Sequence, residues 1–187
     1  MDVEFTRRSD ARVVVKVERD DGAILETSSP GGHDRLPHDL IHYVVERELG
    51  IDDGIWARLG AGVTYKNFRV VAPPVAKRSP SSPRRQHRSR SKRKGLLEAE
   101  VLVGIFHDIW DGTAEREWGS VRAFLDTIWS PRTRSRTDEL DDATIRRVCR
   151  ALDETEAAWR RVGAGESESL RVSWPQQSVR HSLSSSR

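Results

Sequence analysis

The 187-residue chain has one cysteine, few aromatic residues and no long apolar run. The single thiol, Cys149, excludes an intramolecular disulfide and is typical of proteins kept in a reducing cytosol. No run reaches the roughly 18 apolar residues that a membrane-spanning helix needs, and MDVEFTRRSDAR at the N-terminus lacks the apolar core of a signal peptide. We therefore expect a cytoplasmic protein with no membrane partner.

Acidic residues are missing from residues 77–94, KRSPSSPRRQHRSRSKRK. This segment holds nine of the 32 Lys and Arg residues, which leaves 23 basic residues against 29 Asp and Glu in the rest of the chain. The formal net charge of +3 therefore arises from one segment, and the remainder of the protein is acidic.

Proline and serine accompany these charges, so we predict that residues 72–94 form a disordered linker without core-forming residues. Flexible positive charge binds phosphates weakly, without sequence preference, and in a salt-sensitive way. No aromatic side chain is interleaved to stack on bases, so a solvated linker is the alternative. The candidate nucleic-acid contacts are Arg84, Arg85, Arg88, Arg90, Lys92, Arg93 and Lys94.

The first third of the chain has the alternating pattern of β-strands. RVVVKVERDDGAILETS predicts a hairpin with Val13, Val15 and Val17 on one face and a tight turn at Asp21-Gly22. VEFTRR precedes it, TYKNFRVV indicates a fourth strand, and SLRVSWP indicates a short strand near the C-terminus. The predicted fold class is α+β: an N-terminal antiparallel sheet of three to four strands packs against about four helices, and a short C-terminal strand completes it.

Helical spacing dominates the rest of the sequence. We expect helices in 37–50, 95–112, 116–130 and 137–163, and a short helix or turn in 52–63. The helix in 95–112 is apolar on most of its surface, which favours a central, most buried position. We interpret residues 1–71 and 95–173 as one domain interrupted by the linker, and residues 174–187 as a disordered tail.

LPHDLIHYVVERELG contains the one constellation suited to chemistry. His38 and His42 lie four residues apart, so a helix places both imidazoles on one face, where they can bind one zinc, iron or manganese ion. Zinc sites with the pattern H-E-x-x-H use this spacing, with the Glu as general base. Here Asp39 stands at that position, and its carboxylate is one methylene shorter.

A third ligand has to come from elsewhere. Glu46 lies about 12 Å from His38 along the helix axis, so it is better placed to orient His42 through a hydrogen bond than to bind the metal. The candidates are His33 in the preceding loop and His107, Asp108 and Asp111 in the apolar helix.

The same residues also fit an ordinary helix. Asp39 falls in the first turn, where a carboxylate stabilises the free N–H groups by about 0.3–1 kcal/mol. His38 and His42 lie at the border of the apolar face, where a histidine packs one edge and hydrogen-bonds through the other. Both interpretations remain open at this point.

The segment LPHDLIHYVVERELGIDDGIWARLGAGV resembles a group of small uncharacterised actinobacterial proteins. These share an L-P-H-D-x-x-H-x-x-V-E segment, a β-rich start, an Arg-rich middle, a helical second half and a short terminal strand. The resemblance implies that residues 36–46 are the signature of that group. It implies no activity.

Three functions follow as expectations. The first is a non-catalytic interaction or regulatory module with a protein partner. The second is a metal-dependent hydrolase that uses the His38/His42 helix. The third is a nucleic-acid-associated protein that acts through the basic linker. No cofactor other than a divalent metal is indicated.

Overall fold

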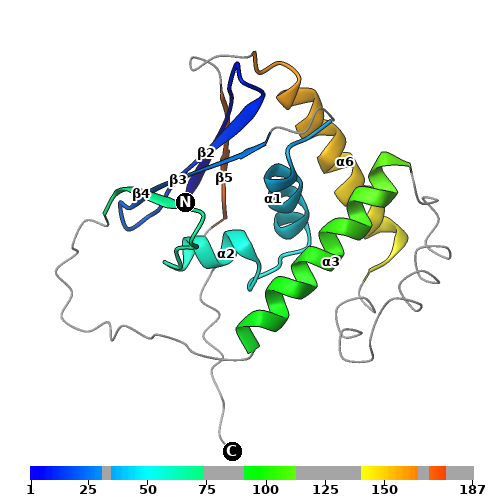
Figure 1. The fold of residues 1–187 in the computed structure, drawn as a ribbon. Coiled ribbons are helices and arrows are strands. Elements are labelled where there is room, and N and C mark those ends of the chain that lie inside the picture. Colours follow the sequence, from blue (N-terminus) through cyan, green and yellow to red (C-terminus); the bar gives the residue numbers. More distant parts are fainter. Residues whose placement is uncertain (31–34, 74–90, 113–139, 164–168, 176–187) are drawn as a thin grey trace, which may run out of the picture.

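The computed structural model describes residues 1–30, 35–73, 91–112, 140–163 and 169–175, which form an α+β fold (Figure 1). Its strands are β1 (Asp2–Arg7), β2 (Arg12–Glu18), β3 (Ile24–Pro30), β4 (Arg69–Ala72) and β5 (Ser169–Ser173). Its helices are α1 (His38–Glu48), α2 (Ile55–Gly60), α3 (Ser91–Asp111) and α6 (Asp142–Trp159). The predicted fold class is confirmed.

The five strands form one antiparallel sheet in the order β4-β3-β2-β1-β5. The predicted hairpin is β2–β3, but its loop has three residues, 20–22, because the Arg19 N–H donates to the Ala23 carbonyl. Gly22 alone adopts a positive φ, at 84°, which is the conformation that such a loop requires. The C-terminal strand β5 pairs with β1 and so forms the edge of the sheet opposite β4.

One face of the sheet is apolar and the other carries charge. Val13, Val15 and Val17 are buried on the inner face, as the alternation predicts. On the outer face, register partners from all five strands form a row of alternating charge. We call this set the outer charge row: Arg171, Glu4, Lys16, Glu26 and Arg69.

Helix α1, and not α3, is the central helix. It lies between the sheet and the pair α3 and α6 (Figure 1), and its seven consecutive residues 40–46 are all buried. The prediction for the apolar segment 95–112 was wrong in this respect, because α3 packs one face only. Leu97 on α3 is 66% exposed, and Gly104 is exposed as well.

The end of α1 fixes the path of the chain into α2. Gly50 has a φ of +62°, and its N–H donates to the Arg47 carbonyl while the Ile51 N–H donates to the Glu46 carbonyl. This pair of hydrogen bonds is the glycine-dependent helix end known as the Schellman motif. It turns the chain so that Trp56 on α2 packs edge-on against Tyr43 on α1.

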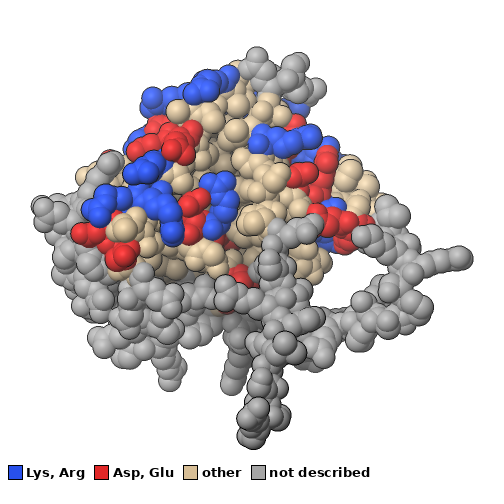
Figure 2. All heavy atoms as spheres, turned by 180° about the vertical axis from the view of Figure 1, so that it is seen from behind, with Lys and Arg blue, Asp and Glu red and all other residues tan. Residues whose placement is uncertain are grey.

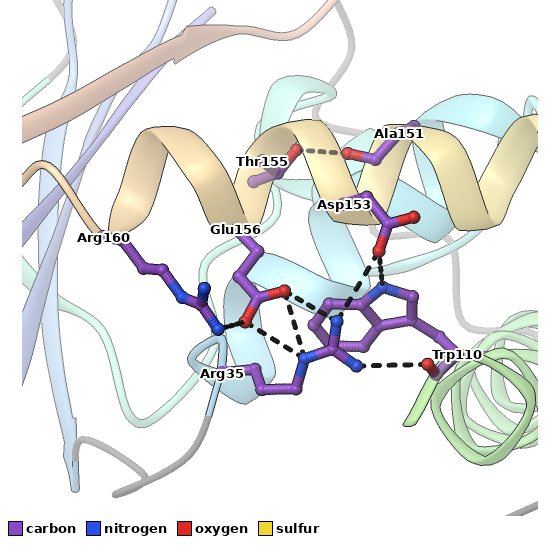
Figure 3. Close-up of polar contacts among 7 residues, drawn as sticks. All are labelled: Arg35, Trp110, Ala151, Asp153, Thr155, Glu156 and Arg160. Atoms are coloured by element: carbon purple, nitrogen blue, oxygen red, sulfur yellow. Dashed lines mark hydrogen bonds and ion pairs between the residues drawn. The ribbon is translucent and has the colours of Figure 1, made fainter. Parts of the chain in front are cut away.

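Arg35 links the loop before α1 to both outer helices (Figure 3). Its guanidinium donates to both carboxylate oxygens of Glu156 on α6 and to the Trp110 carbonyl on α3. It also stacks 3.8 Å from the centre of the Trp110 ring. The Trp110 indole N–H in turn donates to Asp153, so one cation joins three segments that are distant in sequence.

Described parts of the fold extend into the segments that were predicted as linker and tail. Ala72 is the last residue of β4, and α3 begins at Ser91, so helical backbone covers residues 91–94. Trp174 is buried, packs edge-on against Tyr43, and donates its backbone N–H to the Met1 carbonyl. It therefore belongs to the core and not to the tail. The helix expected in 116–130 lies outside the described residues.

Candidate metal centre

Two helices bring three candidate metal ligands to one point. His38 and His42 come from the first half of α1, and Glu100 comes from α3, which packs against it. The Nε2 atom of His42 lies 3.1 Å from Nε2 of His38 and 3.3 Å from Oε2 of Glu100. All three ligand atoms lie within 4.8 Å of one another.

These spacings are close to those of a tetrahedral zinc site. Nitrogen and oxygen ligands lie about 2.0–2.2 Å from zinc, so two of them at a tetrahedral angle are roughly 3.4 Å apart. The two distances measured from His42 are close to that edge. The third pair, His38 and Glu100, lies within 4.8 Å. Two imidazoles and one carboxylate also form a donor set found in catalytic zinc sites.

Glu46 holds His42 in the orientation that a metal requires. Its carboxylate is fully buried and accepts hydrogen bonds from the backbone N–H groups of Ile55 and Trp56. The His42 Nδ1 lies 3.3 Å from Glu46 Oε1. Because a carboxylate can only accept, Nδ1 carries the proton, and the lone pair of the neutral ring is at Nε2. This carboxylate–histidine arrangement supports many metal sites.

Gly54 makes room for this carboxylate. It precedes α2, and a Cβ atom at this position would overlap the Glu46 carboxylate. We expect Gly54→Ala to displace Glu46, to lower the free energy of unfolding by about 1–3 kcal/mol through lost buried hydrogen bonds, and to weaken metal binding. Urea denaturation and zinc titration measure the two effects. The matched control is Gly60→Ala, where a Cβ has only ordinary contacts; equal losses in both variants would contradict this prediction.

The two histidines differ in electrostatic environment. Burial and the neighbouring His42 charge hold the pKa of His38 below its usual value. Burial also opposes a charge on His42, but the hydrogen bond that its Nδ1–H donates to Glu46 and the charges of Glu100, Glu46 and Asp39 outweigh it and raise the pKa of His42. The raised pKa favours a second proton on His42, at Nε2, beside the Glu46 and Glu100 carboxylates. A divalent cation bound at Nε2 would take the place of that proton.

Two other residues predicted for the site, Asp39 and His107, are not among the three candidate ligands that converge. Asp39 lines a cavity together with Glu100, and its Oδ2 accepts a hydrogen bond from the Ser29 hydroxyl. His107 is not among the converging residues; its Nδ1 faces Asp108 at 3.7 Å and Asp111 at 4.0 Å. It follows Glu100 by seven residues, which is about 10 Å along the helix.

The burial of His42 corrects only the expectation that this ring lies at the border of the apolar face. His42 is 1% exposed and Glu46 is 0% exposed, so neither lies at a polar border. His38 is exposed, and Glu100 has a side chain that is 52% exposed. The site is therefore buried on the His42 side and open to solvent on the other.

The candidate ligand that the sequence did not indicate is Glu100. It lies within GLLEAEVLVGIF, where a glutamate on an amphipathic helix indicates only a solvated position. The candidates predicted from the same helix were His107, Asp108 and Asp111. The candidate from the loop before α1, His33, lies outside the described residues.

The structure does not describe a surface formed by the candidate nucleic-acid contacts. Arg84, Arg85, Arg88 and Arg90 lie outside the described residues, and Lys92, Arg93 and Lys94 fall in the first turn of α3. On the face seen in Figure 2, Lys and Arg side chains lie among Asp and Glu side chains. Within the described part of the chain, no helix is long and apolar enough to cross a membrane.

Comparison with protein-family models, curated protein sequences and solved structures found no match to this chain.

Proposed function

We propose that the protein is a metal-dependent hydrolase whose metal, with zinc the best fit, is bound by His38, His42 and Glu100. The observation that carries the proposal is the approach of Nε2 of His38 and Oε2 of Glu100 to Nε2 of His42, whose other nitrogen is held by Glu46. Structural zinc sites use four protein ligands, whereas catalytic sites use three and leave one position for water. Three ligands and an open side favour the catalytic type.

A metal at this point would lower the pKa of its bound water to near neutrality. Asp39 is the candidate general base, since it stands where the Glu of H-E-x-x-H stands and lines the same cavity as Glu100. The water would give a proton to Asp39, and the hydroxide would attack the electrophilic atom of the substrate. The bond to the leaving group would then break, and the leaving group would take the proton from Asp39.

The first test is the metal content of the full chain after loading with zinc and dialysis. We expect about one zinc per chain. Glu100→Gln should weaken binding by more than the roughly 10–100-fold that loss of a supporting partner costs, because it removes a ligand. Glu154→Gln, an exposed acid on α6, is the matched control and should bind zinc normally.

The second readout is zinc-dependent hydrolysis of 4-nitrophenyl acetate. Asp39→Asn should keep the zinc and lose this hydrolysis, whereas Glu100→Gln should lose both. A parent protein without stoichiometric metal would contradict the metal site. A metal-loaded parent without hydrolysis, or Asp39→Asn with full activity, would contradict the catalytic role.

The other two expectations stay predictions. A non-catalytic interaction module would bind neither metal nor nucleic acid. Nucleic-acid association would disappear on deletion of residues 77–94, which removes all seven candidate contacts together with the first turn of α3, and it would fall steeply with salt.

A further inference from the structure

A cavity of about 250 Å³ adjoins the metal centre. It shares Glu100 with the candidate ligands and Asp39 with the candidate base, and it runs between α1, α2, the segment before β4, and α3. Its other walls are largely apolar and aromatic: Ile55, Trp56, Tyr65, Phe68 and Leu96.

The charges and size of this cavity limit what it can bind. None of the described residues that line it is Lys or Arg, and both charged residues are acidic. An anionic group inside it would meet two carboxylates and apolar walls, so burial would be costly. A cavity of about 150 Å³ lined by Leu, Ile and Phe can bind benzene, so this one has room for a single ring and a few linking atoms.

We propose that this cavity binds the uncharged side group of the substrate, a single phenyl-sized apolar group attached to an ester or amide carbonyl. The inference rests on the proposed function, because the metal would polarise that carbonyl while the side group fills the cavity. In the hydrolysis the metal-activated water adds to the carbonyl carbon. The C–O or C–N bond breaks, and the alcohol or amine leaves with the proton that Asp39 accepted from the water.

The closing experiment compares two metal-binding probes on the Co²⁺-substituted full chain. Benzohydroxamate and acetohydroxamate bind a metal through the same atoms, but only the first carries a ring. Visible absorption of Co²⁺ reports metal binding first and hydroxamate binding second. We expect benzohydroxamate to bind at least about tenfold more tightly, since burial of a ring in an apolar site is favourable.

A matched pair of variants tests whether the cavity causes this preference. Leu96→Trp fills the cavity and should reduce the preference to about onefold, with acetohydroxamate binding unchanged. Leu97→Trp, one residue further and pointing to solvent, should keep the preference. If Leu96→Trp does not fold, Asn67→Trp at the rim replaces it, with Lys66→Trp as its control.

Each outcome has one meaning. Co²⁺ binding with equal affinity for the two hydroxamates overturns the substrate class and leaves the metal site intact. A preference that survives the filling variant also overturns it. Failure to bind Co²⁺ at all overturns the proposed function, and this inference with it.

Discussion

Glu46→Gln is expected to lower the free energy of unfolding by about 2–3 kcal/mol and to weaken zinc binding by about 10–100-fold. The side chain keeps its size, but its amide nitrogen cannot accept a hydrogen bond. In the parent, one carboxylate accepts from two backbone N–H groups at the start of α2 and from His42. The substitution therefore leaves at least one buried donor without an acceptor and frees the His42 ring.

Urea denaturation and zinc competition titrations measure the two losses. The matched control is Glu18→Gln, since this carboxylate lies on the outer face of the sheet and its side chain is 39% exposed. Its ion pair with Lys16 should contribute less than about 1 kcal/mol. A stable Glu46→Gln protein with unchanged zinc affinity would show that Glu46 does not position His42.

Arg35→Gln is expected to lower the free energy of unfolding by about 2–3 kcal/mol at neutral pH. Loss of one partner of a buried ion pair costs roughly 3–5 kcal/mol, and the smaller figure allows for the 36% exposure of the Arg35 side chain. The Glu156 side chain is only 7% exposed and would keep Arg160 as its cation. The variant also loses the stacking of the guanidinium on Trp110.

The dependence of stability on pH separates this ion pair from packing. The hydrogen bond from Arg35 holds the pKa of Glu156 below its usual value despite burial. This contribution is present above the unfolded pKa of Glu, about 4.3, and is lost as the pH falls through the lower folded value. Denaturation at several pH values should therefore show the parent and Arg35→Gln converging in stability in acid. The control Arg146→Gln, on the exposed face of α6, should lose little at any pH. A gap between parent and Arg35→Gln that is constant with pH would contradict the role of the charge.

The sheet was predictable because its signals are local. Alternating valines mark the inner face of β2, and Gly22 marks the turn. Which helix is the most buried was not predictable in the same way. The segment of α3 is the more apolar of the two, but α1 is buried on more sides because the sheet and two helices all pack against it. The difference is one of tertiary environment, which periodicity in one segment does not contain.

Half of the candidate site could be read from the sequence. The spacing of His38 and His42 places both rings on one helical face, and the orienting role expected for Glu46 agrees with its hydrogen bond to His42. Glu100 could not be found, because its importance depends on the register with which α3 crosses α1. Asp39 and Glu100 meet in one cavity only through the same crossing.

The outer charge row has a consequence for strand alignment. Val13, Val15 and Val17 are interchangeable if β2 slides by two residues, since the apolar face is then preserved. The charges are not interchangeable. With Glu4 opposite Lys16 and Lys16 opposite Glu26, a slip that brings Glu18 to the position of Lys16 would place it opposite both Glu4 and Glu26. Like charges in direct opposition are unfavourable, so the solvent-facing side of this sheet carries the alignment information that its repetitive interior lacks.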